Sequence, residues 1–367
     1  AADNIAAITC DATTNTLVYL DENDTSVRPP ILWMDVRATE EASFIDTIRE
    51  EYDATKFYKP GFRADTMVPK CMWVKKNEPE NWAKTKTIME FEDWLNWKLT
   101  GRKTVSMSVA AFRWNYDDKN GGYPVDFYNA VGLDDVVDKF PEPVLKVGEV
   151  VGNISAEAAE IFGLSKKTVV VEGTADCNAC MFGVGGVRPN GMTLIGGTST
   201  CLLGLSEEEF HVDGVNGTYP NCMYDGTSLL EGGQTAAGSI LTWFKNNLLP
   251  AAWMQEAVNR NMNIYDLITE KASAVPIGCD GLVMMDYFQG NRAPYADSKA
   301  RGMFWGLSIG TTPAHLARAV YEGVAYGANH CIVSMKKAGY DVKEIYACGG
   351  LAQSDFWMQM HADIIGV

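Results

Sequence analysis

One carboxylate and one glycine- and threonine-rich loop are the residues of this sequence best suited to chemistry. Asp176 follows an apolar run that predicts a buried strand over residues 169–171. A second apolar run, residues 192–195, leads directly into the loop GGTST at residues 196–200. Such an aspartate can accept a proton from an attacking hydroxyl, and such a loop lets backbone N–H groups approach phosphate oxygens. The two features together indicate phosphoryl transfer, although an aspartate after a strand also serves as a turn former or a helix cap.

Two other glycine pairs could bring the backbone close to a ligand. Residues 345–348 predict a strand that ends in Gly349-Gly350, and a helix follows whose N-terminal N–H groups could meet a phosphate or nucleotide. Gly232-Gly233 leads into a helix whose first turns contain only small residues. Small residues there permit the close approach of a ligand, and they equally permit close helix packing.

A third candidate is the pattern W-x-D-x-R formed by Trp33, Asp35 and Arg37, which ends a short apolar strand. These side chains could contact a ligand. They could equally form a structural ion pair beside a packed indole, so the pattern alone leaves both interpretations open.

Hydrophobic spacing predicts the elements that would position these residues. Two strands, 5–10 and 16–20, are expected around a turn at residues 11–15. The other expectations are helices over 38–53, 79–99 and 313–332, a loop-like stretch over 205–230, and a strand over 362–367. The third of these helices should begin at Thr312-Pro313, a cap followed by an N-terminal proline.

Length and composition restrict the class of protein. A chain of 367 residues is too long for one ordinary core, so two domains are expected, with a boundary near residue 165. The 31 basic and 47 acidic residues give a net charge of −16, which argues against nucleic acid or an anionic membrane as a partner. No apolar run reaches the length of a membrane span.

Cysteine and histidine usage argues against a zinc or redox site. Nine cysteines are scattered without a framework, which favours reduced thiols in the cytoplasm. Cys177 and Cys180 form a lone C-x-x-C, and no second pair lies at zinc-binding spacing. The four histidines are far apart in the sequence and form no ligand cluster.

Read together, these stretches resemble the FGGY family of carbohydrate kinases over essentially the whole chain. The family's C-terminal signature is met at every defined position by GMFWGL at 302–307, HL at 315–316 and AVYE at 319–322. Its other signature is met in part. Lys70, Trp73, Val74 and Asn77 fit, whereas Met67 and Cys71 depart from it. The remaining family-like stretches are WMDVRA (33–38), LTG (99–101), GTADCNACMFGVG (173–185), GGTST (196–200), GGQTAAG (232–238), GNRAPYADSKARG (290–302) and ACGGLAQSDFWMQMHAD (347–363).

The resemblance implies an α/β, actin-like (ribonuclease H-like) two-domain ATPase fold with a cleft between the domains. Residues 1–165 would be the N-terminal, sugar-side domain and residues 166–367 the C-terminal, ATP-side domain. The implied enzyme is a phosphotransferase that moves the γ-phosphoryl group of ATP, with Mg²⁺, to a sugar or polyol hydroxyl. Homodimers occur among relatives, so a homodimer is a further expectation.

The resemblance also implies roles for individual positions. Asp176 would be the general base. ATP would be contacted by Gly197, Thr198, Gly238, Thr242, Gly350 and Ser354, and the sugar by Asp11, Thr14, Asn15, Trp33, Asp35, Arg37 and Cys177.

Two departures from the family pattern limit these assignments. The Asp-x-Gly-Thr hairpin that handles phosphate and metal in the family has no counterpart before Ile5, and the family's last helices have none after Val367. The expectation is that the chain lacks both ends. The metal ligands therefore stay unknown.

The substrate is expected to be a pentulose such as ribulose. The turn CDATTNTLVYLD at residues 10–21 is closer to the turn of ribulokinase-like members than to that of xylulose or glycerol kinases. Xylulose, glycerol and four-carbon polyols are the alternatives within the family. Outside it, the alternatives are an actin-like ATP-binding protein without sugar transfer and a hydrolase with a Ser or Cys nucleophile, for which no histidine partner is evident.

Overall fold

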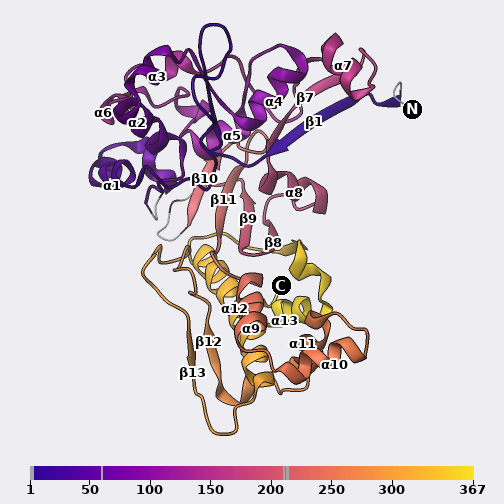
Figure 1. Ribbon diagram of the computed structural model, residues 1–367. Coiled ribbons are helices and arrows are strands. Elements are labelled where there is room, and N and C mark those ends of the chain that lie inside the picture. Colours follow the sequence, from indigo (N-terminus) through magenta and orange to yellow (C-terminus); the bar gives the residue numbers. More distant parts are fainter. Residues whose placement is uncertain (1–3, 59–60, 210, 212–214) are drawn as a thin grey trace. The chain divides into compact units, whose positions relative to one another are not determined.

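The computed structural model describes residues 4–58, 61–209, 211 and 215–367 (Figure 1). The chain forms two compact units. The first comprises Ala1–Gly183, Ser206–His211 and Gly217–Leu229, and the second comprises Val184–Leu205, Val212–Asn216 and Leu230–Val367. The domain boundary near residue 165 stays a prediction, whereas the first changeover between the compact units falls at Gly183 and Val184.

The first unit is built on a three-stranded sheet in the order β1–β7–β6 (Figure 1). Strand β1 runs parallel to β7, with Asp11 opposite Thr174 and Ala12 opposite Ala175. The carboxyl ends of parallel strands lie at the same edge of a sheet, so the turn after β1 and the residue after β7 come together there. The elements are β1 (Ala7–Ala12), β2 (Leu17–Leu20), α1 (Thr39–Ile48), α2 (Met67–Asn77), α3 (Pro79–Lys84), β3 (Thr87–Glu90), α4 (Phe91–Thr100), β4 (Val105–Ser106), α5 (Met107–Arg113), α6 (Val125–Ala130), β5 (Val144–Leu145), β6 (Val150–Asn153), α7 (Ala156–Phe162), β7 (Val169–Ala175) and α8 (Asp176–Val184).

The rest of the chain contains a five-stranded sheet in the order β10–β11–β9–β8–β14 and a two-stranded ribbon, β12–β13. Strand β14 runs parallel to β8, with Cys348 opposite Ile195, so the glycine turns that follow these strands share one sheet edge. The elements are β8 (Gly191–Gly196), β9 (Thr200–Ser206), β10 (Asn216–Pro220), β11 (Ser228–Gln234), α9 (Gly238–Asn247), α10 (Ala251–Asn259), α11 (Ile264–Ser273), β12 (Val283–Met285), β13 (Met303–Trp305), α12 (Pro313–Lys337), β14 (Glu344–Cys348) and α13 (Asp355–Ile365).

Helix α12 forms the centre of the core of the second unit. It begins as predicted at Thr312 and Pro313, and His315 completes a capping box because its Nδ1 accepts a hydrogen bond of 3.2 Å from the backbone N–H of Thr312. Val320 and Val324 on its buried face pack in one cluster with Phe244 of α9. This core holds α9, α11 and α13 around the pocket described below.

Three expectations about elements are wrong. The helix expected over residues 79–99 is two helices, α3 and α4, separated by the strand β3. The loop-like stretch 205–230 contains β10 and the start of β11, and residues 362–365 belong to helix α13 rather than to a strand. In the first case the apolar residues that suggested a helix include Met89, which lies in a strand buried at all four positions. Periodicity cannot separate such a strand from a buried helix segment.

Among the described residues, no helix is both long enough and apolar enough to cross a membrane.

Candidate functional site

Asp176 is the first residue of helix α8, directly after β7, and it is only partly shielded from solvent. Its Oδ1 accepts a hydrogen bond of 2.6 Å from the backbone N–H of Cys177, which fixes the orientation of the carboxylate. Partial burial raises the pKa of Asp176 above its ordinary value. The charge of Asp11 adds to this rise, whereas the Cys177 N–H and the charge of Arg113 oppose it. The predicted base therefore lies close to other charged groups of the same sheet edge.

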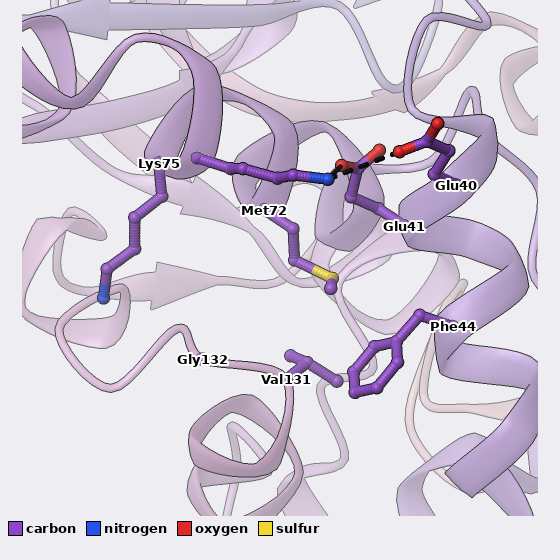
Figure 2. A pocket seen from close by; sticks show the side chains of 8 residues that line it. Glu40, Glu41, Phe44, Met72, Lys75, Val131 and Gly132 are labelled. Atoms are coloured by element: carbon purple, nitrogen blue, oxygen red, sulfur yellow. Dashed lines mark hydrogen bonds and ion pairs between the residues drawn. The ribbon is translucent and has the colours of Figure 1, made fainter.

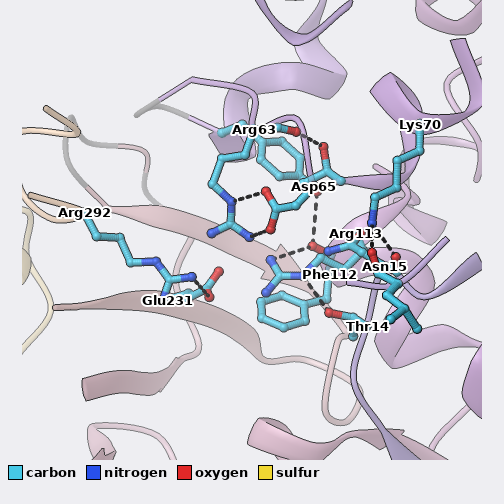
Figure 3. A network of polar contacts seen from close by, with 12 residues as sticks. Thr14, Asn15, Arg63, Asp65, Lys70, Phe112, Arg113, Glu231 and Arg292 are labelled. Atoms are coloured by element: carbon cyan, nitrogen blue, oxygen red, sulfur yellow. Dashed lines mark hydrogen bonds and ion pairs between the residues drawn. The ribbon is translucent and has the colours of Figure 1, made fainter. Parts of the chain in front are cut away.

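The predicted sugar-side turn, residues 11–15, lies at that edge. Asp11 is exposed, and Asn15 is buried with φ +61°, in the left-handed region. The hydroxyl of Thr14 accepts a hydrogen bond of 3.1 Å from Nε of Arg113 (Figure 3). Asp11, Thr14 and Asp176 are thus brought together, and Cys177 follows Asp176 on α8. Arg113, the last residue of α5, was not predicted, because a single basic residue outside any motif gives no sequence signal of its position.

Trp33, Asp35 and Arg37 lie in a turn-rich segment rather than in a strand, after a single bridge at Ile31. The indole of Trp33 is 47% exposed, so it is not packed in the core. Asp35 and Arg37 bind each other through two hydrogen bonds of 2.9 and 2.6 Å, and the hydrogen bonds from Arg37 lower the pKa of Asp35 to about 2. Of the two interpretations that the sequence left open, the ion pair describes Asp35 and Arg37. A contact with the sugar stays a prediction for Trp33, Asp35 and Arg37.

A cavity of about 770 Å³ lies within the second unit and collects every residue predicted to contact ATP. Gly197, Thr198, Gly238, Thr242, Gly350 and Ser354 all line it. The walls are completed by side chains that sequence analysis missed, among them Tyr265, Asp266, Thr269 and Trp357. Tyr265, Asp266 and Thr269 belong to α11, for which no helix was predicted. Trp357 was within the family-like stretch 347–363 but was not singled out.

Glycine is required where helix α9, the loop at residues 196–200 and the turn Gly349-Gly350 approach one another. A Cβ added to Gly238 would lie 2.5 Å from the carbonyl oxygen of Gly197, and one added to Gly349 would lie 2.4 Å from that of Gly196. The backbone N–H of Gly238 donates to the Gly197 carbonyl at 3.0 Å, which locks the loop against the helix. The backbones are therefore packed so closely that only glycine fits.

Two predicted hydroxyls already have partners in this cavity. Ser354 caps α13, because its Oγ accepts a hydrogen bond of 3.3 Å from the N–H of Trp357. Thr242 Oγ1 lies 3.2 Å from the Tyr265 hydroxyl and donates to the Gly238 carbonyl at the same distance. Both hydroxyls organise the wall of the cavity, and their contact with a nucleotide stays a prediction.

No group of three or more His, Cys, Asp or Glu side chains suited to a metal ion is found among the described residues.

A second pocket of about 420 Å³ lies between α1 and α2 and contains none of the predicted residues (Figure 2). Phe44, Met72 and Val131 form its apolar part. The Lys76 ammonium closes one side, 3.3 Å from Glu40 and 3.4 Å from Glu41. The charges at its rim are thus paired with one another, and no ligand is assigned to this pocket.

Comparison with known proteins matches both halves of the chain to one family. The N-terminal domain of the FGGY family of carbohydrate kinases matches residues 1–183, and its C-terminal domain matches residues 192–367. The ribulokinase of Bacillus licheniformis is 30% identical over 377 residues, which is 98% of this chain and 68% of the relative. Ribulokinase 2 of Staphylococcus saprophyticus is also 30% identical, over 99% of this chain and 70% of the relative.

A solved structure has the same fold. The xylulose kinase of Rhodospirillum rubrum superposes with a TM-score of 0.82 at 27% identity, over 98% of this chain and 70% of that one. The predicted fold class, a two-domain actin-like α/β fold, is therefore confirmed.

Proposed function

Because this chain belongs to the FGGY family of carbohydrate kinases, we propose that it transfers the γ-phosphoryl group of ATP to a hydroxyl of a pentulose such as ribulose. That it is a sugar kinase follows from the family; the pentulose and the residue roles are the proposal. The observation that carries the proposal is the cavity of the second unit, which is lined by all six residues expected to contact ATP.

We propose that ATP binds in this cavity, and the fit of its backbone supports the assignment. Gly197 and Gly350 bring main chain without a side chain to the wall of the cavity, and Gly238 allows the loop to lie against the start of α9. The N–H of Gly197 donates to the Ser199 carbonyl, and the N–H groups of Gly238 and Ser239 donate to loop carbonyls, so these bonds fix the shape of the loop. The positive end of the α9 dipole lies at this loop, which favours phosphate. ATP supplies the phosphoryl group that is transferred. Mg²⁺ is proposed only as a companion of the phosphates.

Asp176 is proposed as the general base. Its carboxylate accepts the proton of the attacking sugar hydroxyl while that oxygen bonds to the γ-phosphorus and the bond from this phosphorus to the bridging oxygen of ADP breaks, so that ADP leaves. Its orientation is set by the Cys177 N–H, and its raised pKa makes it a better proton acceptor than an ordinary aspartate. Arg113, 5% exposed, contributes positive charge beside the developing alkoxide.

The pH dependence of kcat at saturating sugar tests this role. The base must be ionised, so kcat should fall with decreasing pH through the pKa of Asp176, at a midpoint above the ordinary aspartate value of 3.8. Asp11→Asn removes a negative charge that raises this pKa, and the acid limb should move to lower pH. If the acid limb of the pH profile keeps its position in Asp11→Asn, its assignment to Asp176 is contradicted.

The substrate is proposed from the turn at residues 11–15 and from the ribulokinases among the relatives. Xylulose, glycerol and a four-carbon polyol remain the alternatives, since the fold is shared with a xylulose kinase. A coupled ADP-release screen over pentuloses, tetritols and glycerol tests it, with a pentulose expected to give the highest kcat/KM. Equal ADP release with and without every sugar would favour an ATP-binding protein without sugar transfer.

We further infer a cytoplasmic location, because nine cysteines scattered without a disulfide framework favour reduced thiols. A homodimer is proposed on family grounds alone, and light scattering of the purified protein tests it.

A further inference from the structure

Two buried, oppositely charged side chains lie near the main chain of Asn15, the last residue of the turn at 11–15. Nζ of Lys70, on α2, donates a hydrogen bond of 2.7 Å to the carbonyl oxygen of Asn15 (Figure 3). The carboxylate of Glu90, at the end of β3, lies near the backbone N–H of Asn15, which lowers the pKa of Glu90. Lys70 is 0% exposed and Glu90 is 1% exposed. The carbonyl of Asn15 is thus fixed by a charged donor, and its N–H lies near a negative charge.

Lys70 also joins this turn to the segment that carries Trp33. The same ammonium donates a second hydrogen bond, 2.9 Å long, to the carbonyl oxygen of Leu32. The backbone N–H of Trp33 donates to Thr16 Oγ1 at 3.1 Å, which links the same two segments from the other side. Lys70 is therefore a common anchor for both stretches of chain in which sugar-contacting residues were predicted.

The conformation and burial of Asn15 fit such an anchor. Its backbone has φ +61°, in the left-handed region, which asparagine tolerates better than most residues, and its side chain is 2% exposed with Oδ1 unpaired in the structure. The hydrogen bond from Lys70 to the Asn15 carbonyl holds this turn from outside. A buried ammonium is costly unless it is hydrogen-bonded and its charge is offset. The carbonyls of Asn15 and Leu32 accept its hydrogen bonds, and the nearby charge of Glu90 favours its charged form.

We propose that Lys70 and Glu90 are positioning residues that hold the turn 11–15 and the Trp33 segment in the arrangement that receives the sugar. The identity of the ligand rests on the proposed function, whereas the anchoring of the two segments does not. Neither side chain is placed in contact with the reacting atoms.

The charges around the pair make the anchor sensitive to pH. Burial lowers the pKa of Lys70 to about 8, opposed by the charges of Glu90, Asp65, Asp35 and Cys71. Burial raises the pKa of Glu90 to about 7, opposed by the hydrogen bond from Trp114, by the charges of Lys70 and Arg113 and by the backbone N–H of Asn15. Glu90 gains a proton below pH 7 and Lys70 loses one above pH 8. Both groups are charged together only between these values, where sugar affinity should be highest.

The test compares Lys70→Met, which keeps the apolar stem, with Lys76→Met, a control on the same helix whose side chain is 61% exposed. Loss of hydrogen bonds from a charged donor should raise the KM for the sugar about tenfold or more in Lys70→Met. The KM for ATP and kcat at saturating sugar should stay within about threefold of the unmodified protein. The decline of sugar affinity above pH 8 should disappear, and Lys76→Met should change none of these quantities.

Backbone hydrogen exchange gives a reading that is independent of catalysis. In Lys70→Met, exchange should accelerate at residues 11–17 and 31–35 and stay unchanged in α12. Unchanged exchange in those two segments would overturn the anchoring. Accelerated exchange with an unchanged KM for the sugar would overturn the link to the sugar site.

Two further outcomes are distinguishable. If Lys70→Met does not fold, Glu90→Gln tests the same anchor. The KM for the sugar should then rise less than expected for Lys70→Met, and the decline of sugar affinity below pH 7 should disappear. ADP release by the unmodified protein without any sugar would remove the proposed function, while the exchange measurement would still decide the anchoring.

Discussion

Asp176→Asn is expected to lower kcat for sugar phosphorylation by at least about a hundredfold, since a general base contributes roughly 10²–10⁴ in rate. The amide has almost the same shape as the carboxylate and can still accept the Cys177 N–H through its oxygen. It cannot accept the proton of the sugar hydroxyl. Binding of ATP and sugar should therefore remain nearly intact, and the loss should be in kcat. Steady-state kinetics with isothermal titration calorimetry for both ligands measures the two effects separately.

A matched control for this variant is Asp138→Asn, at an exposed aspartate of the same unit. It makes the same chemical change away from the site and should leave kcat unaltered. Phosphorylation by Asp176→Asn at near the normal rate would remove Asp176 from the reaction. Loss of sugar binding together with kcat would instead give the side chain a binding role.

Gly238→Ala is expected to weaken ATP binding about tenfold or more. Its new Cβ would lie 2.5 Å from the Gly197 carbonyl oxygen, so either the loop or the start of α9 must move. Overpacking of this kind costs about 1–3 kcal/mol. Helix propensity alone predicts that this substitution stabilises the fold, because alanine is favoured over glycine in a helix by about 1 kcal/mol. The sign of the change in folding stability therefore separates the steric argument from intrinsic helix preference.

Gly310→Ala is the matched control, because its nearest neighbour, the Ser308 hydroxyl, would lie 3.6 Å from the added carbon, an ordinary contact. Calorimetric titration with ADP and thermal unfolding measure the two variants side by side. We expect weaker ADP binding and a lower Tm for Gly238→Ala and neither change for Gly310→Ala. Identical behaviour of the two variants would mean that the loop relaxes around the extra carbon without cost.

The network around Arg113 and Lys70 could not be read from the sequence. Lys70 meets the carbonyls of Asn15 and Leu32, and Arg113 meets the Thr14 hydroxyl. These partners are far apart along the chain, and no local pattern relates them. Lys70 was noticed only as part of a family signature, and its role as an anchor follows from its burial and its two hydrogen bonds.

The sequence by itself determined which residues stand at the ends of strands. Asp176 after β7, the loop after β8 and Gly349-Gly350 after β14 were each predicted, because apolar runs followed by glycine or aspartate mark a strand and its exit. The start of α12 was predicted for the same reason, since its cap and proline act locally. The family was also determined by the sequence, because its signature motifs are contiguous.

Only the tertiary structure decided which of these strand ends meet. The pairing of β1 with β7 brings the turn 11–15 to Asp176, and the pairing of β14 with β8 brings Gly350 and Gly197 to one cavity. Tertiary packing also placed the strand β3 within a stretch of helical spacing and added α11 to the wall of the cavity. The physical reason is that strand pairing and the burial of a charge depend on groups distant in the chain, whereas caps, turns and strand exits depend on neighbours.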